Sequence, residues 1–198
     1  EGEYESQTGT NVYRDFVELP SQLMENWATE KEFLDLWAVH YETGEPIPAE
    51  IVDRIVAAQN YLAAYGNVRQ LSFGMTDMAW HTLTEPFEGD VERFEAVSMA
   101  PTQVLPVVSG TAMAPAFGHI FSGGYAAGYY GYKWAEVLEA DAFSLFKEKG
   151  IFNREVASSF RENVLSKGGT EHPMELYVRF RGHKPETKAL IEKMGLGK

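Results

Sequence analysis

Four tyrosines and a histidine lie close together in residues 117–134, whose sequence is FGHIFSGGYAAGYYGYKW. A tyrosine cluster this dense is costly to bury as plain core, because every buried phenol oxygen needs a hydrogen-bond partner. If the segment is helical, Tyr125, Tyr129 and Tyr132 are spaced i, i+4 and i+7 and share one face. Two interpretations stay open: an aromatic core helix with a glycine hinge, or phenols that point into a cleft together with the imidazole of His119.

The glycines of this segment mark a change of backbone direction. Gly123 and Gly124 lie where a loop containing His119 is expected to turn into the tyrosine helix. Glycine is used where the backbone must bend sharply or approach another group closely. Tyr130 and Trp134 fall on a neighbouring face of the same helix, and that face could pack inward.

A second group of polar side chains recurs along residues 15–27, DFVELPSQLMENW. Asp15, Glu18, Gln22 and Glu25 follow spacings of three, four and three, which predicts one shared helical face. This stripe is either a solvated helix face, or a carboxylate metal ligand with further acids that orient the other ligands. A single glutamate cannot hold zinc, so two or three more ligands would have to come from elsewhere.

The histidines do not supply those ligands by spacing. None of the five forms the i, i+4 pair of an HExxH helix. We expect His40 and His81, near helix ends, to be capping or surface residues, and His172 and His183, in short charged loops, to be solvated. The motifs therefore contain no complete zinc site.

Composition restricts the class of protein. The sequence has 198 residues, 44% hydrophobic and 23% charged, which is typical of one soluble globular domain. A net charge of −12 disfavours a nucleic-acid partner, because phosphate binding needs a basic surface. No apolar run is long enough to span a membrane, and the absence of cysteine excludes disulfides and thiolate metal sites.

Apolar residues at helical spacing predict a mainly α, multi-helical fold with long irregular loops, and no period-2 strand pattern occurs. The expected helices are two pieces meeting near Pro20 within residues 15–41, then residues 48–66, 67–83, 90–100, the tyrosine helix to about 149, 153–167, and short helices opened by Pro173 and Pro185. Residues 101–118 are expected to be irregular. Asp90 and Asn153 are the expected N-caps, and the expected helix ends are Gly66, Gly182 and Gly195.

Three segments resemble the thimet oligopeptidase family of zinc metallopeptidases, which includes the bacterial oligopeptidase A and peptidyl-dipeptidase Dcp groups. They are SQTGTNVYRDFVELPSQLMENW, GTAMAPAFGHIFSGGYAAGYYGYKWAEVLEADAF and GIFNREVASSFRENVLSKGGTEHPMELYVRFRGHKP. The segments follow the family order and cover most of the chain, and the bacterial branch is the more similar. The resemblance implies that residues 1–198 form a single helical unit, the C-terminal portion of a zincin-type catalytic domain.

The resemblance also implies a metal site. In this family two histidines of an HEFGH helix and a downstream glutamate bind zinc, and that glutamate corresponds to Glu18. Glu25 matches an acidic residue that supports the ligands, and Asp15 is expected to act similarly. The HEFGH helix is expected to precede Glu1, so the chain alone is expected to be inactive and its partner to be the missing N-terminal part of the same protein.

The tyrosine segment corresponds to the substrate-binding part of the family. His119, Tyr125 and Tyr132 match residues that contact peptide substrate and the tetrahedral intermediate. Gly123 and Gly124, the substrate loop, fit a flexible segment that folds over bound peptide, where Tyr129 either binds substrate or packs.

These resemblances imply hydrolysis of short peptides in the cytoplasm, as either an oligopeptidase or a peptidyl-dipeptidase. A non-enzymatic helical module that binds peptides or a partner is the alternative, and a proteolytic remnant without a role is a third. We also expect an exposed apolar patch over residues 15–27, where the HEFGH helix would pack, and self-association through it.

Overall fold

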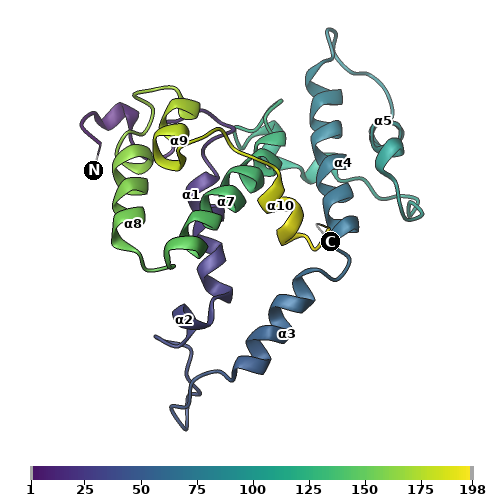
Figure 1. Cartoon of the computed structure of the whole chain (residues 1–198). Coiled ribbons are helices and arrows are strands. Elements are labelled where there is room, and N and C mark those ends of the chain that lie inside the picture. The colour runs from purple at the N-terminus through teal and green to yellow at the C-terminus, as the bar shows by residue number, and fades with distance from the viewer. Residues whose placement is uncertain (1, 197–198) are drawn as a thin grey trace. The chain divides into compact units, whose positions relative to one another are not determined.

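The computed structural model describes residues 2–196, and its regular structure is helical (Figure 1). This described part contains ten α-helices with single turns of 3-10 or π-helix, and no β-strand beyond an isolated bridge between Val39 and Pro46. The mainly α, multi-helical fold class expected from the sequence is confirmed. Every helix within residues 2–196 is too short or too polar to cross a lipid bilayer.

Internal contacts divide the chain into two compact units, each with its own buried core. The first unit comprises residues 1–61 and 134–198, and the second comprises residues 62–133. The expectation that residues 1–198 form one helical unit stays a prediction.

The first unit contains most of the helices. They are α1 (Leu19–Glu25), α2 (Lys31–Leu34), α3 (Ala49–Gln59), most of α7 (Tyr130–Lys149), α8 (Arg154–Phe160), α9 (Pro173–Arg181) and α10 (Lys188–Lys193). Single 3-10 turns occur at Glu5–Gln7 and Asn26–Thr29, and a π-helical turn follows α8 at Arg161–Leu165. The core combines apolar faces of α1, α7, α8 and α9: Leu19, Leu23, Leu138, Ala142, Phe143, Phe146, Val156, Phe160, Tyr177 and Phe180.

Helix ends in this unit follow local sequence signals. The side-chain oxygen of Asn153 accepts hydrogen bonds from the backbone amides of Glu155 and Val156 at 3.0 and 3.1 Å, which confirms the expected N-cap of α8. Pro173 occupies the first turn of α9, where a missing N–H costs nothing. Gly182 ends α9 at φ 89°, a left-handed conformation that suits glycine.

Some expected helix boundaries are wrong. The helix expected over residues 48–66 ends at Gln59 as α3, and Leu62 then adopts φ 55°. Gly66 lies inside the next helix and is not a stop signal, because a helical glycine costs only about 1 kcal/mol relative to alanine. Pro185 does not open a helix either, since α10 begins at Lys188.

Buried carboxylates of α7 pair with side chains of other helices in the first unit. Glu139 is 2% exposed, and its two oxygens accept hydrogen bonds from Lys193 Nζ and Asn26 Nδ2, both at 2.6 Å. Burial raises the pKa of Glu139 above its ordinary value, although the bond from Lys193 acts in the opposite direction. Asp141 accepts a hydrogen bond from Tyr177 Oη at 2.5 Å. These pairs join α9 and α10 to α7.

The second unit is built on one long helix. Its regular elements are α4 (Ala63–His81), α5 (Val91–Met99), α6 (Gly118–Phe121), the first turn of α7, and 3-10 turns at Ala100–Thr102 and Ala114–Ala116. Phe73, Phe117 and Ile120 form its buried cluster. The carboxylate of Asp90 accepts a hydrogen bond from the backbone amide of Arg93 at 2.8 Å, which confirms the expected N-cap of α5.

The connection over residues 101–118 is largely irregular, as expected, and a buried carboxylate holds part of it. Glu95 of α5 is 9% exposed and accepts hydrogen bonds from the backbone amides of Met113 and Ala114, the latter at 2.6 Å. Such bonds satisfy backbone donors that a loop leaves without secondary-structure partners.

Exposed apolar side chains of the first unit are concentrated after α1. Over residues 15–27, Met24 is the one large apolar side chain that is exposed. Residues 36–61 expose many more: Leu36, Trp37, Val39, Tyr41, Ile51, Ile55, Val56 and Tyr61. The patch expected over residues 15–27 is therefore small. Self-association stays a prediction.

Candidate functional site

The predicted histidine and tyrosines gather in the second unit around the ring of His119. Its ring centroid lies 5.9 Å from that of Tyr125, 6.0 Å from that of Tyr129 and 6.1 Å from that of Tyr132. Tyr125 and Tyr132 stack at 4.9 Å with 22° between their planes. His119 is exposed and the three tyrosines are half-buried. The cluster, defined as these four residues, can therefore meet a ligand from solvent.

The gathering does not come from one helical face. Helix α7 begins at Tyr130, so Tyr125 and Tyr129 lie in the turns before it and Tyr132 lies in its first turn. His119 belongs to the short helix α6 and not to a loop. Tyr130 is 52% exposed, so the face that it shares with Trp134 does not pack inward at this residue.

A tight glycine turn brings Tyr125 beside His119. The amide of Gly123 donates to the carbonyl of Gly118 at 2.7 Å, and the amide of Tyr125 donates to the carbonyl of His119 at 3.0 Å. A Cβ at Gly123 would lie 2.9 Å from His119 Cα, closer than a side chain can approach backbone. Gly124 adopts φ 82°, which favours glycine. Both positions therefore require glycine for the turn itself.

Tyr129 connects the cluster to the core of the second unit. Its ring lies 5.7 Å from that of Phe73, edge to face, and 5.0 Å from that of Phe117. Burial raises the pKa of the Tyr129 phenol, with Arg69 nearby acting in the opposite direction. The phenol is therefore protonated at neutral pH, and packing is an evident part of its role.

Asp77, a carboxylate of α4 that is 1% exposed, also belongs to this region and was not predicted from the sequence. Its Oδ1 accepts a hydrogen bond from the amide of Ala127 at 2.8 Å, and its Oδ2 accepts one from the amide of Tyr129 at 2.9 Å. His81 Nδ1 lies 2.7 Å from Oδ1 of the same carboxylate. The signal was an acidic residue beside the apolar stripe of residues 67–83, four positions before a histidine.

Glu18, the expected zinc ligand, lies in the first unit at the N-terminal end of α1. Pro20 falls in the first turn of that helix, where its fixed φ is helical, so the expectation that it can begin a helix is confirmed. Ser21 Oγ donates a hydrogen bond to Glu18 Oε2 at 2.7 Å, which fixes the direction of the half-buried carboxylate.

The polar stripe of this segment does not share one helical face from end to end. Residues 14–18 form turns, so Asp15 precedes α1 and Glu18 is its N-cap, while Gln22 and Glu25 lie within the helix. Turn geometry replaces helical geometry here because Pro20 favours the start of a helix over its interior. Glu25 is exposed and Asp15 is half-buried, and their support of metal ligands stays a prediction.

The residues described here do not make a complete metal centre. Within residues 2–196, no group of three or more histidine, aspartate or glutamate side chains is placed to hold a metal ion. Zinc sites in proteins use three or four protein ligands. The Glu18 carboxylate is a suitable donor for one of them, so the chain fits a zinc site only as a contributor.

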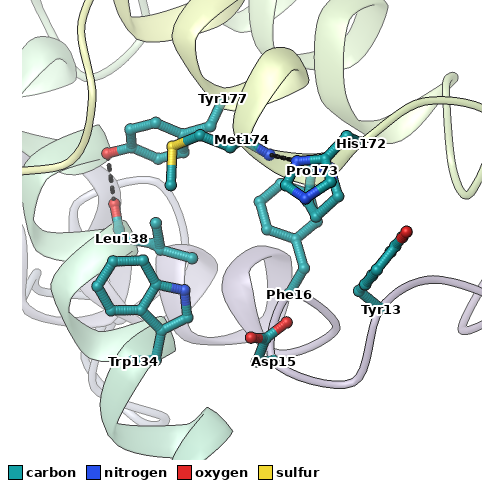
Figure 2. A pocket seen from close by; sticks show the side chains of 9 residues that line it. All are labelled: Tyr13, Asp15, Phe16, Trp134, Leu138, His172, Pro173, Met174 and Tyr177. Carbon is teal, nitrogen blue, oxygen red and sulfur yellow. Dashed lines mark hydrogen bonds between the residues drawn. The ribbon is translucent and has the colours of Figure 1, made fainter.

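Asp15 borders a cavity of about 370 Å³ in the first unit, shown in Figure 2. The cavity is lined by Tyr13, Asp15, Phe16, Trp134, Leu138, His172, Pro173, Met174 and Tyr177. Trp134 packs against the core, as expected. His172 is exposed, as expected, and its Nδ1 accepts a hydrogen bond from the amide of Met174 at 3.2 Å, which caps α9.

The remaining histidines have local roles. His40 is exposed, and its Nδ1 accepts from the amides of Glu42 and Thr43, both at 3.3 Å, in agreement with a surface or capping residue. His183 is half-buried, and its Nδ1 lies 2.6 Å from the carbonyl oxygen of Lys184. Neither lies in the cluster.

Comparison with known proteins identifies the class to which this helical chain belongs. Residues 2–196 match the family described as Peptidase family M3, and the chain belongs to that family. The resemblance drawn from the residues is confirmed.

Individual relatives show how much of such a protein the chain represents. It is 51% identical over 184 residues to oligopeptidase A of Salmonella typhimurium, covering 92% of this chain and 27% of the relative. It is 38% identical over 195 residues to dipeptidyl carboxypeptidase of Escherichia coli, covering 98% and 29%. It is 33% identical over 196 residues to thimet-like oligopeptidase of Dictyostelium discoideum, again covering 98% and 29%. The chain spans little more than a quarter of the length of these relatives.

Proposed function

We propose that the protein containing this chain hydrolyses peptide bonds in short peptides with the help of zinc. The observation that carries the proposal is the family match over residues 2–196, together with the gathering of the family-type histidine and tyrosines. The names of the relatives, oligopeptidase A and dipeptidyl carboxypeptidase, support a peptide substrate. Because the chain spans 27% to 29% of these relatives, we place the other zinc ligands, on an HExxH helix, outside it.

The cluster would act on the peptide carbonyl. When water attacks that carbon, negative charge develops on oxygen, and donors already aimed at it stabilise the transition state. Tyr125 and Tyr132 are the proposed phenol donors, and their stacked rings make both part of one surface. The exposed imidazole of His119 would hydrogen-bond the substrate beside them. Tyr129 would support its neighbours by packing.

Glu18 would supply one zinc ligand, with Glu25 and Asp15 orienting other ligands. A zinc ion in such a site activates the peptide carbonyl and the attacking water as a Lewis acid. Glu18 lies in the first unit and the cluster lies in the second. Gly123 and Gly124 would let the loop close over bound peptide. A cytoplasmic location is carried by the resemblance alone.

The decisive test is Tyr132→Phe in the full-length protein, assayed on a short peptide. We expect kcat to fall by roughly 100- to 1000-fold, the usual cost of removing one oxyanion donor. Tyr130→Phe is the matched control, because Tyr130 is an exposed tyrosine of the same helix turn outside the cluster. Its turnover should stay near that of the natural protein. Equal turnover in both variants would reject the proposed role of Tyr132 as a phenol donor.

Zinc content separates the enzyme from a non-enzymatic binding module. We expect about one zinc ion per full-length molecule, and a large loss of zinc in Glu18→Gln, because a neutral amide is a poorer ligand than a carboxylate. Glu25→Gln should lose less zinc than Glu18→Gln, since that residue is proposed only to orient ligands. A natural protein without zinc that still binds peptide would favour the binding module.

A further inference from the structure

The carboxylate of Asp77 is buried in the second unit and uses both of its oxygens. It is 1% exposed and accepts hydrogen bonds from the amides of Ala127 and Tyr129 at 2.8 and 2.9 Å. A buried carboxylate is tolerated only when hydrogen bonds replace the water that it has lost. Asp77 therefore holds two backbone positions of the tyrosine segment against α4.

The turn that it holds is unusual. Ala127 adopts φ 51°, a left-handed conformation that side chains other than glycine rarely take. The amide of Gly128 donates to the carbonyl of Tyr125 at 2.8 Å, and the amide of Tyr132 donates to that of Tyr129 at 3.2 Å. The two residues whose amides bond to Asp77, Ala127 and Tyr129, thus lie in the sequence between the two stacked tyrosines, Tyr125 and Tyr132.

A third partner fixes the carboxylate itself. His81 Nδ1 lies 2.7 Å from Asp77 Oδ1 and 2.9 Å from the Asp77 carbonyl oxygen. Because both neighbours are acceptors, Nδ1 carries the proton and donates it. The imidazole ring of His81 also lies 5.8 Å from that of Phe121, at the end of α6. Asp77 is therefore held in one orientation by its own helix.

We propose that Asp77 is a positioning residue for the cluster: its carboxylate fixes the turn over residues 125–129 and so sets where the Tyr125 and Tyr129 phenols lie relative to Tyr132 and His119. Its consequence for turnover rests on the proposed peptidase function, whereas the placement of the rings does not. Loss of the carboxylate leaves the rings present but displaced.

The test compares Asp77→Asn with Glu95→Gln. Glu95 is also buried in this unit and also accepts hydrogen bonds from two backbone amides, of Met113 and Ala114, outside the tyrosine turn. Both substitutions keep the size of the side chain and remove its charge. They should have comparable effects on stability, and only Asp77→Asn should disturb the cluster.

Ring placement is read by fluorine NMR of the protein labelled with 3-fluorotyrosine, with signals assigned by single Tyr→Phe changes. In Asp77→Asn the Tyr125 and Tyr129 signals should shift or broaden, and the amides of Ala127 and Tyr129 should exchange with solvent at least tenfold faster. In Glu95→Gln both should remain as in the natural protein. In peptide assays, kcat of Asp77→Asn should fall by about 10- to 100-fold with little change in KM, since a displacement near 1 Å can cost 100-fold.

Each failure has its own signature. Unchanged fluorine signals in folded Asp77→Asn, or equal changes in both variants, would overturn the positioning role. If Asp77→Asn does not fold, hydrogen exchange in the natural protein decides. Protection of the amides of Ala127 and Tyr129 would support their hydrogen bonds to Asp77, and exchange as fast as in an unstructured loop would overturn the proposal. Displaced rings in a protein whose natural form cleaves no peptide would leave the positioning role standing and reject the peptidase function.

Discussion

Gly123 of the tyrosine segment has little room for a side chain. We predict that Gly123→Ala lowers the free energy of unfolding of the chain by about 1–3 kcal/mol, the usual cost of forcing extra atoms into a packed position. The new Cβ would meet backbone atoms of His119 and Gly118 at 2.9 to 3.2 Å, and backbone cannot yield as a flexible side chain can. Urea unfolding measures the effect.

Gly118→Ala is the control for that substitution. A Cβ at Gly118 would lie 3.6 Å from Ser122 Oγ, which is ordinary van der Waals contact, and the residue begins α6. Its stability should stay within about 0.5 kcal/mol of the natural chain, as for most surface changes. A similar loss in both variants would mean that general flexibility matters here, and not the close approach at Gly123.

At the scale of elements, sequence signals that act between near neighbours predicted several helix ends correctly. The caps at Asp90 and Asn153 and the end of α9 at Gly182 depend on neighbours within four residues, which the sequence contains. The start of α7 was misplaced because periodicity extends through Tyr125 to Tyr132, whereas Asp77, about fifty residues away, bonds the amides before the helix. That long-range contact leaves no periodic pattern in the sequence. The residues of the cluster could therefore be predicted, but their arrangement in space could not.

Gly66 and Gly182 show that the effect of replacing a glycine depends on its backbone conformation. We predict that Gly66→Ala raises the free energy of unfolding by about 0.5–1 kcal/mol, because alanine favours the helix and loses less backbone freedom on folding. The position is helical, and a Cβ there would meet nothing within 4 Å. Gly182→Ala, also in open space but at φ 89°, should instead lower it by about 1–2 kcal/mol. We expect the two substitutions to change the free energy of unfolding in opposite directions, measured by thermal or urea unfolding. A destabilising Gly66→Ala would instead support the original prediction that Gly66 ends a helix.

At the scale of the whole molecule, the first unit is closed by a contact between distant parts of the chain. Asn26 follows α1, Glu139 lies in α7 and Lys193 lies in α10, and the three side chains bond one another at 2.6 to 2.8 Å. Asn26 and Glu139 are buried whereas Lys193 is exposed, and a buried carboxylate is costly to leave without a partner, so the contact favours one arrangement of these helices over others. Sequence patterns could not reveal it, because each residue alone resembles an ordinary polar position.

The raised pKa of Glu139 makes this closure dependent on pH. Burial, the larger influence, lifts the pKa above the ordinary 4.5, so the folded chain binds a proton more tightly than the unfolded chain. Its contribution to stability is therefore complete below pH 4.5 and is lost as pH rises through the raised pKa. We predict that the difference in unfolding free energy between the natural chain and Glu139→Gln falls as pH rises across that window, measured by urea unfolding at a series of pH values. Glu171→Gln, at a half-buried carboxylate whose pKa is lowered by the hydrogen bond from Arg179, should show the opposite slope, with a difference that grows as pH rises. A flat difference for Glu139 would mean that Lys193 compensates its burial completely.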